Sequence, residues 1–298
     1  MSVNYVSHKD IDQDRWDVAI SNATNPKIYA DSWYLNVTTE GQWDAIISDD
    51  YTSVMPLPFN KKLFGISQVY RPFFSQQLGV IHSSKAVDIE DFIKHIPSKF
   101  KRLHYAFNNA NIVEGCTQKT NLILPLKTDY NTVVSNFSSS LRKHIKRSAE
   151  LQLTETSNVE EVITFYKNHL ESKVKLGNKG YDVATKLFAE ALERGCAEVY
   201  QLTNGDDILA SGVFLKKYSR IINVFAASIN TKKHRNTMSV LLARVMEKHS
   251  ESDYIFDFEG SDLKGVKQYF ESFGSTEENY PVLHYNKLPY LVKLIRPS

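Results

Sequence analysis

Residues 254–274, YIFDFEGSDLKGVKQYFESFG, constrain the fold more than any other stretch of this sequence. Within 254–259 an aromatic residue at every second position alternates with Ile, Asp and Glu, and this period of two predicts a strand. Gly260 then breaks the strand, and apolar residues recur at helical spacing between 266 and 273 before Gly274, which fits a helix C-cap. The stretch therefore predicts a strand, a tight turn and a short helix. Two carboxylates lie where the strand ends, the position at which open α/β folds place ligands.

The composition indicates a cytoplasmic protein without a strong electrostatic preference. With 298 residues, 42% of them hydrophobic, the chain is long enough for two domains of about 130–160 residues. Its net charge of +2 gives no argument for binding DNA, other nucleic acid or an anionic membrane. The polar N-terminus does not resemble a signal peptide, and no apolar run approaches the roughly 20 residues of a membrane-spanning helix. Cys116 and Cys196 lack partners at metal-ligand spacing, so we expect buried, reduced thiols and no metal site.

Periodicity predicts a mixed α/β first half with a strand-rich centre. The expected helices cover 12–21, 32–39 and 89–100, and the expected strands cover 3–7, 43–48, 53–59, 69–81, 104–108 and 121–126. Trp16, Trp33 and Trp43 are expected in the core of this half, because they recur on the apolar faces of these elements.

The second half predicts a longer α/β unit after a polar, serine-rich stretch at 127–140. We interpret this stretch as the join between two domains, at 1–130 and 131–298. Asn204-Gly205-Asp206-Asp207 is a strong signal for a hairpin turn. The expected helices cover 141–152, 158–174, 182–194 and 237–250, the expected strands cover 153–155, 197–203, 208–216, 220–228 and 281–285, and a short helix is expected at the C-terminus.

Two segments of the sequence resemble a known family. FDFEGS…GVKQYFESFG resembles the last βαβ unit of the FemAB-like branch of the GNAT N-acyltransferases, and FSSSLRKHIKRSAE resembles the segment that opens their second domain. The resemblance implies a mixed α/β fold with two GNAT-like domains in tandem, although no sequence repeat relates the two halves. It also implies transfer of an acyl group from acyl-CoA, or less readily from aminoacyl-tRNA, to an amine acceptor.

The loop before the expected helix at 237–250 is the position where the resembled family binds the pyrophosphate of acyl-CoA. Backbone N–H groups at a helix N-terminus favour such an anion. The expected cofactor-binding residues are Lys232, Lys233, His234, Arg235, Asn236 and Thr237. The loop lacks the family's glycines, which let the backbone approach phosphate, so a donor other than CoA and a lost donor site both stay open. An ordinary basic surface loop is the remaining alternative.

Asp257 and Glu259 are the expected catalytic residues. N-acyl transfer needs an unprotonated amine, and many GNAT enzymes supply the base from a glutamate in a central strand. The corresponding strand here, 220–228, contains no carboxylate and offers only Asn223, a candidate substrate-binding residue. Positions i and i+2 of a strand point to one face, so both acids can reach the same cleft. The alternative is that they form the turn or cap the following helix.

Two further segments contain candidate substrate-binding residues. The expected helix after 140 gathers four cations on one broad face, and among them Arg142 can line an anionic substrate; a solvated helix face explains the same pattern. The segment 69–81, VYRPFFSQQLGVI, combines Arg71, Phe74, Gln76 and Gln77 into an aromatic, polar-tipped surface that can recognise an amine or peptide. A bent core strand explains that segment equally well.

These patterns support three classes of function. The first is an N-acyltransferase whose small-molecule or peptide amine acceptor binds between two GNAT-like domains. The second is a catalytically inactive GNAT-fold binding module, which the missing loop glycines and the missing central glutamate favour. The third, a nucleic-acid-binding protein, is weakest, because acids balance the basic residues and no recognition motif occurs.

Overall fold

The computed structural model describes residues 2–61, 66–83, 87–229, 231, 235–260 and 262–288. The chain divides into two compact units, and each is described here by itself. Unit 1 comprises Met1–Lys119 together with Asn279–Ser298, and unit 2 comprises Thr120–Glu278. Within the described ranges, no helix is both long enough and apolar enough to cross a membrane.

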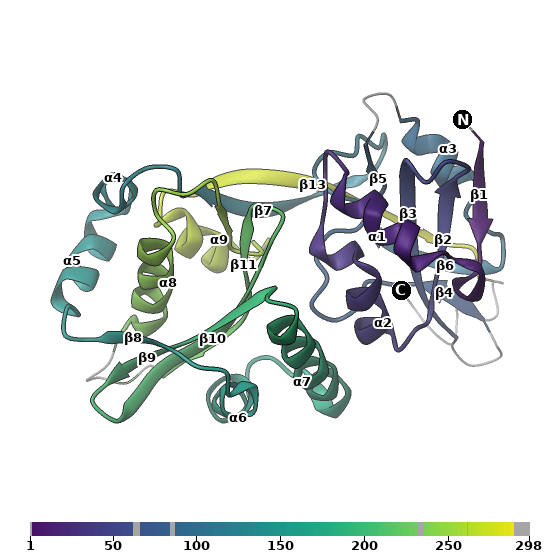
Figure 1. Cartoon of the computed structure of the whole chain (residues 1–298). Coiled ribbons are helices and arrows are strands. Elements are labelled where there is room, and N and C mark those ends of the chain that lie inside the picture. The colour runs from purple at the N-terminus through teal and green to yellow at the C-terminus, as the bar shows by residue number, and fades with distance from the viewer. Residues whose placement is uncertain are drawn as a thin grey trace. The chain divides into compact units, whose positions relative to one another are not determined.

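Unit 1 consists of a mixed sheet and helices, most of which the N-terminal part of the chain forms (Figure 1). Its elements are β1 (Val3–Val6), α1 (Gln13–Ser21), α2 (Ser32–Thr39), β2 (Trp43–Ser48), β3 (Ser53–Lys61), β4 (Ser67–Val69), β5 (Ile81–His82), α3 (Ile89–Lys94) and β6 (Phe100–Ala106). The sheet order is β1-β2-β3-β4-β6, with β5 on β3, and only β4 and β6 run parallel among these pairs. All three tryptophans are buried, as the sequence predicted, and the Trp16 and Trp43 rings lie 5.0 Å apart.

The segment predicted as a strand over 69–81 is mostly irregular, so that prediction is wrong. Phe74 and Gly79 have φ angles of 57° and 81°, which no strand allows. Side chains from a distant loop hold the backbone instead: Val80 N–H donates to Asn111 Oδ1 at 2.8 Å, and Asn108 Nδ2 donates to Leu78 O at 2.9 Å. These asparagines satisfy backbone groups that a sheet would otherwise pair.

Unit 2 repeats the order of elements seen in unit 1. The elements from Thr117 onward are β7 (Thr117–Pro125), α4 (Tyr130–Ser135), α5 (Ser139–Arg147), β8 (Gln152–Glu155), α6 (Val159–Leu170), α7 (Gly177–Glu193), β9 (Ala197–Asn204), β10 (Asp207–Lys217), β11 (Arg220–Ser228), α8 (Thr237–Lys248), β12 (Ile255–Asp257), α9 (Lys264–Glu271) and β13 (Thr276–Asn286). Of these, β7 begins in unit 1, and β13 passes from unit 2 into unit 1 at Asn279. The run from β8 to β12 in unit 2 has the order strand, two helices, three antiparallel strands, helix and a parallel strand. The run from β1 to β6 in unit 1 has the same order apart from the short β5. The predicted hairpin turns at Gly205 and Asp206, which confirms that prediction.

Helices cover both faces of the unit 2 sheet, whose order is β7-β12-β11-β10-β9-β8. Figure 1 shows α6 and α7 on one side of β9–β11 and α8 with α5 on the other. The apolar face predicted for α8 is buried in a core that α5 and α9 share. Its residues include Leu241, Leu242, Val245 and Met246.

Strand pairing does not follow the order of the chain at the ends of the units. β7 follows β6 in sequence but pairs with β12 of unit 2, and β13 follows α9 but pairs through Val282–Asn286 with β6 of unit 1. The units therefore differ from the sequence-based domains 1–130 and 131–298 at both of these strands. The stretch 127–140 is also no plain linker, because Asp129 caps α4 and both Val133 and Phe137 are buried.

Several helix limits also differ from the predictions. The helix expected over 89–100 ends at Lys94, since Pro97 disfavours helical backbone before it and Phe100 already begins β6. Cys196 is buried as expected, whereas Cys116 is only half-buried. The predicted C-terminal helix lies outside the described residues.

Candidate functional site

The parallel strands β11 and β12 separate partway along β11. Residues 220–222 pair with 255–257, where β12 ends, whereas β11 continues to Ser228. A register shift in the β10–β11 pairing at the same place leaves Val224 as an extra residue, which is a β-bulge. Within the described residues, the second half of β11 thus has no β12 partner. Bulges of this kind bend strands and are frequent beside active sites.

The N-terminus of α8 follows this open part of β11. Asn236, the N-cap residue, is left-handed with φ of 58° and makes no side-chain capping hydrogen bond. Thr237 is buried, and its hydroxyl donates to Ile229 O at 2.9 Å. The first backbone N–H groups of α8 therefore lack a side-chain cap, and together with the helix dipole they suit an anion. Exposed Arg235 precedes them, while Lys232, Lys233 and His234 lie outside the described residues.

An ion network with one buried member, Asp257, and two partly buried members lies at the end of β12. The Arg220 guanidinium donates to Asp257 Oδ2 at 2.7 Å and to Glu278 Oε1 at 2.6 Å, and Asn121 Nδ2 donates to Glu278 Oε2 at 3.3 Å. Burial alone would lower the pKa of Arg220, but Asp257 and Glu278 raise it above its usual range. One cation thus faces two carboxylates, and each of the three groups comes from a different strand. Asp257 is held in an ion pair and is 3% exposed.

Glu259 lies on the turn after β12 and not on the strand. The strand ends at Asp257, and Glu259 is left-handed with φ of 49°. Its N–H donates to Asp257 Oδ1 at 3.0 Å, and Gly260 N–H donates to Asn121 Oδ1 at 2.9 Å. The predicted strand alternation through Glu259 is therefore wrong, because these side-chain acceptors fix a turn two residues earlier. The half-buried Glu259 still lies beside Asp257 through this turn.

Asn223 provides an unpartnered polar atom where the two strands separate. It pairs across the sheet with Phe214, whose ring is in the core beneath α8, so its side chain faces the same side. Its Oδ1 is buried without a hydrogen-bond partner. Since buried acceptors in native proteins are nearly always paired, this atom is available to a ligand.

Arg142 lies on α5, which has the predicted amphipathic form. Leu141 and Ile145 are buried, and Ser138 caps the helix by accepting from Leu141 N–H at 3.3 Å. Arg142 donates to Ser135 O at 2.6 Å, which ties α5 to the end of α4. The observed contact is therefore local, and substrate binding by Arg142 stays a prediction.

The four candidates from 69–81 lie in unit 1. Gln76 and Gln77 are buried, with Gln77 Nε2 donating to Gln76 Oε1 at 2.8 Å. Asn109 N–H donates to Gln77 Oε1 at 3.0 Å, so these amides hold the irregular segment in place. Phe74 accepts a hydrogen bond from Tyr34 at its carbonyl, and Arg71 is exposed. Their contacts are those of a structural loop, and their role in substrate binding stays a prediction.

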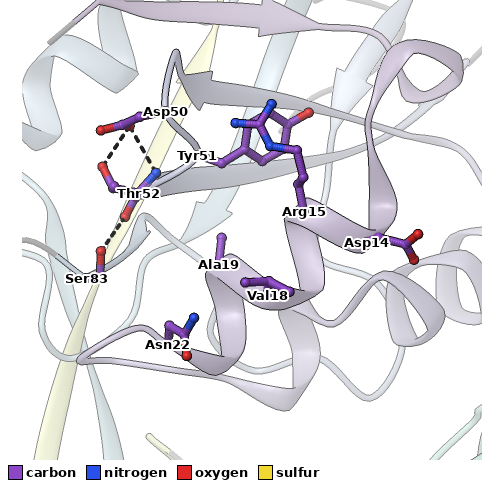
Figure 2. Close-up of a pocket in the computed structure, with 9 residues that line it drawn as sticks. All are labelled: Asp14, Arg15, Val18, Ala19, Asn22, Asp50, Tyr51, Thr52 and Ser83. Atoms are coloured by element: carbon purple, nitrogen blue, oxygen red, sulfur yellow. Dashed lines mark hydrogen bonds between the residues drawn. The ribbon is translucent and has the colours of Figure 1, made fainter.

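Figure 2 shows a surface pocket of unit 1, about 380 Å³, between α1 and the turn that joins β2 to β3. The Arg15 guanidinium lies 4.2 Å from the centroid of the Tyr51 ring. Asp50 accepts from the N–H and hydroxyl of Thr52 at 3.0 and 2.8 Å. These polar groups partner one another and fix the turn, and the pocket contains none of the predicted site residues. Elsewhere in the described ranges, no three His, Cys, Asp or Glu side chains gather as metal ligands.

Sequence reasoning missed Arg220, Asn121 and Glu278. Arg220 opens an apolar strand and faces Asp257 on the neighbouring strand, and this cation at the start of RIINVFAAS was the available signal. Asn121 and Glu278 are 157 positions apart, so nothing in the local pattern joins them. Their pairing depends on which strands become neighbours.

The element order, the parallel strands that separate and the helix N-terminus beside them define a GNAT-like fold. No known family profile and no curated protein sequence matches this chain. Among solved structures, FemX matches with a TM-score of 0.65 at 11% identity, covering 100% of both chains. A conserved protein of unknown function from Bacteroides thetaiotaomicron VPI-5482 matches at 0.59 and 10%, covering 93% of this chain and 98% of that one. L-PGS from Bacillus licheniformis matches at 0.52 and 14%, covering 95% of each. The chain therefore has the FemAB-like fold, with two GNAT-like units in tandem, as the sequence predicted.

Proposed function

We propose that this protein is an N-acyltransferase, which moves an acyl or aminoacyl group from its donor to an amine acceptor. One observation carries the proposal: β11 and β12 separate beside the uncapped N-terminus of α8, within a GNAT order of elements. The separation frees backbone groups of β11 for a donor. The N–H groups of α8 suit the donor's phosphates.

The described residues suggest a division of roles within unit 2. Arg235, Asn236 and Thr237, with the preceding basic residues of the loop, hold an anionic donor such as acyl-CoA. Glu259 receives the proton of the attacking amine, a step that contributes about 10²–10⁴-fold in general acid–base catalysis. Asp257 fixes the turn that carries Glu259, because its two carboxylate oxygens already accept from Arg220 and from Glu259 N–H. The acceptor is a small-molecule or peptide amine.

Direct titration tests the donor site. Wild-type protein is titrated with acetyl-CoA, a long-chain acyl-CoA and free CoA by calorimetry. We expect saturable binding, weakened more than tenfold by Lys233→Ala with Arg235→Ala, because the double variant removes two positive charges from the proposed phosphate-binding loop. Lys94→Ala with Lys186→Ala removes the same charge from exposed helix positions and should leave affinity unchanged. Equal weakening in both double variants would show that donor binding depends only on the overall charge of the protein. Equal affinity in wild type and the loop variant would show that the loop is ordinary surface.

A catalytically inactive GNAT-fold binding module is the second candidate. The observation in its favour is that β11 contributes no carboxylate, while Asp257 is ion-paired with Arg220. An inactive module would bind donor or amine without turnover. Release of free thiol from acyl-CoA, followed with a panel of amines, separates the two candidates.

A further inference from the structure

One face of the unit 1 sheet is lined by side chains that donate hydrogen bonds. The antiparallel register sets His104 of β6 opposite His284 of β13, and Arg102 opposite Asn286. The parallel register sets Gln68 of β4 beside Arg102. Residues paired across strands share a face, as do residues two positions apart on one strand, so these five side chains lie together. We call this surface the β6–β13 face, and all of it belongs to unit 1.

The two histidines form one row of the β6–β13 face. Their ring centroids are 5.8 Å apart, and the rings meet edge-on at 67°. Both histidines are exposed, and Arg102, two positions from His104, is half-buried. Opposite residues of an antiparallel pair lie about 5 Å apart, and residues i and i+2 of a strand about 7 Å apart. One tetrahedral anion can therefore contact the imidazole row and the guanidinium row together.

Few of these donors are used within the protein. Asn286 Oδ1 accepts from Leu288 N–H at 3.2 Å, which leaves the amide N–H groups of Asn286 to donate. Among the described residues, none accepts a hydrogen bond from the side chain of Arg102 or Gln68, and no carboxylate pairs with either histidine. A guanidinium has five N–H donors in a planar fork and no acceptor, so this face has donors in excess.

The chain around the β6–β13 face is basic, although the protein as a whole has a net charge of only +2. Three segments contain no Asp or Glu: 51–87, which includes β4, 92–113, which includes β6, and 279–298, which includes the β13 residues that pair with β6. The acids of unit 1 lie in other segments. The strands that form this face therefore carry a net positive charge, and such a surface attracts anions.

The charges that act on His104 are all positive. Burial lowers the pKa of this imidazole, and the charges of Arg71, His284 and Lys119 lower it further. Arg71 follows β4, and Lys119 lies on β7, the strand next to β13 in the sheet order. Arg102 adds a cation from the same strand as His104. A bound anion would reverse this effect, because a negative charge favours the protonated imidazole.

We propose that Arg102, His104 and His284 form an anion site of unit 1 that binds the phosphate monoester group of a small molecule. The Arg102 fork donates to two phosphate oxygens, the two imidazoles donate to the others, and the amides of Gln68 and Asn286 lie at the rim. A phosphate monoester fits better than a carboxylate, because its tetrahedral oxygens reach both rows and it carries up to two negative charges. This site does not depend on the N-acyltransferase function, whose donor phosphates we place at α8 of unit 2.

The test is a titration of the full chain with phenyl phosphate, followed by ¹H–¹³C NMR of the histidine rings. We expect saturable shifts of the His104 and His284 signals, while the signal of His95, an exposed histidine of the same unit, stays unmoved. Benzoate, a planar monovalent anion, should bind at least tenfold more weakly, and neutral phenol should not bind. The double variant Lys233→Ala with Arg235→Ala should bind phenyl phosphate at the two histidines like wild type, which keeps this site distinguishable from the acyl donor site.

Charge removal on the two faces of β6 gives matched variants. Arg102→Gln should weaken phenyl phosphate binding at least tenfold. Lys101→Gln is the control, because Lys101 is the preceding residue of the same strand, is exposed and alternates onto the opposite face. Its affinity should change by less than about twofold, since solvent screens a charge on that face. His284→Gln, at an exposed position, should weaken binding several-fold and tests the same site if Arg102→Gln fails to fold.

The pH dependence is a second readout. Binding should tighten at least threefold from pH 8 to pH 6, because the bound anion raises the pKa of His104 and the complex takes up a proton. The second ionisation of a phosphate monoester, with a pKa of about 6, acts in the opposite direction, so the gain must come from the protein. His104→Gln should remove most of it.

Three results would overturn the proposal. Benzoate binding as tight as that of phenyl phosphate would mean that the face does not select phosphate. Equal affinities in Arg102→Gln and Lys101→Gln would mean that only overall charge matters. Binding of a short DNA duplex at the two histidines, without saturable binding of phenyl phosphate, would mean that the face is a polyanion surface.

Discussion

Asp257 and Glu259 lie two positions apart in the sequence but have different surroundings. Asp257 is buried against Arg220, whereas Glu259 occupies a left-handed position on the turn that Asp257 holds. A buried carboxylate that partners a guanidinium contributes to the fold, and removal of Asp257 leaves Arg220 with Glu278 as its remaining counter-charge. The two acids should therefore respond differently to substitution.

Glu259→Gln is expected to lower kcat by about 10²–10⁴-fold and to lower stability less than Asp257→Asn does, since it removes the proposed proton acceptor but keeps the size of the side chain. Asp257→Asn should lower the free energy of unfolding by about 1–3 kcal/mol, because Arg220 keeps Glu278 but loses one of its two counter-charges. Turnover per folded molecule and urea unfolding, measured on the same preparations, distinguish the roles. The reverse pattern, a stable but inactive Asp257→Asn and an unstable Glu259→Gln, would exchange the two assignments.

Glu198 forms a second, partly buried charge cluster, away from the site residues in sequence. Its Oε2 accepts from the Tyr200 hydroxyl at 2.8 Å and lies 2.7 Å from His249 Nε2, and Lys216 donates to Oε1. Burial opposes ionisation, but the hydrogen bonds from His249, Lys216 and Tyr200 lower the pKa of Glu198 from 4.5 to about 2. A folded-state pKa below the unfolded one stabilises the protein above pH 4.5, and this stabilisation is lost as the pH falls toward 2.

Glu198→Gln is expected to lower the free energy of unfolding by about 1–2 kcal/mol at pH 7, because solvent still screens part of the cluster. The difference from wild type should shrink to less than half at pH 3. Urea unfolding at pH 7, 5, 4 and 3 measures it. Glu190→Gln, which breaks the surface pair with Arg194, should change stability by less than about 0.5 kcal/mol at every pH. A pH-independent difference for Glu198→Gln would mean that lost packing, and not charge, explains it.

The irregular segment 70–80 shows how side chains can replace a sheet. Gly79 combines a φ of 81° with close approach of its neighbours, since an added Cβ would lie 2.1 Å from Asn111 Oδ1 and 2.8 Å from Asn108 N. Gly115 has a similar φ of 70° but open space around it. The two glycines therefore separate backbone strain from packing.

Gly79→Ala is expected to lower the free energy of unfolding of unit 1 by about 3 kcal/mol or more, from strain and steric overlap together. Gly115→Ala should lower it by about 1 kcal/mol, from strain alone. Tryptophan fluorescence is the measurement, because all three tryptophans lie in unit 1. Equal losses in the two variants would show that the asparagine contacts around Gly79 can move aside.

Much of this fold was predictable because most elements are periodic. The strand Arg220–Ser228 and the helix Ser32–Thr39 have the predicted limits, since an apolar run or an apolar face specifies each locally. The failures have tertiary causes. Asn108 and Asn111 override the strand pattern of 69–81 from about 30 positions away, and the final strands of the two units pair outside chain order. The loop before α8 was predictable as a candidate donor site from its position, and its role stays a prediction, whereas Arg220, Asn121 and Glu278 were recognisable only from their three-dimensional neighbours.

Deletion of residues 279–298 is expected to unfold unit 1, because it removes the β13 residues that pair with β6. The tryptophan emission should shift to longer wavelength and lose its cooperative melting transition. Deletion of 289–298 alone retains every pair from Val282 to Asn286 and is the control, with an expected wild-type spectrum. A wild-type spectrum for the longer deletion would show that β6 is stable with β4 as its only neighbour.

The strands that pair outside chain order also delay the completion of unit 1 during translation. β6 ends at Ala106, and its pairing with the antiparallel β13 begins at Val282, so the ribosome must add 176 residues (282 minus 106) after Ala106 to reach this partner. At about 5–20 residues per second, this takes on the order of 10–35 seconds. Throughout that interval the nascent chain exposes one unpaired edge of β6, where it can aggregate with another chain or bind a chaperone. Unit 1 is therefore the first unit to be synthesised, but its sheet is the last to be completed.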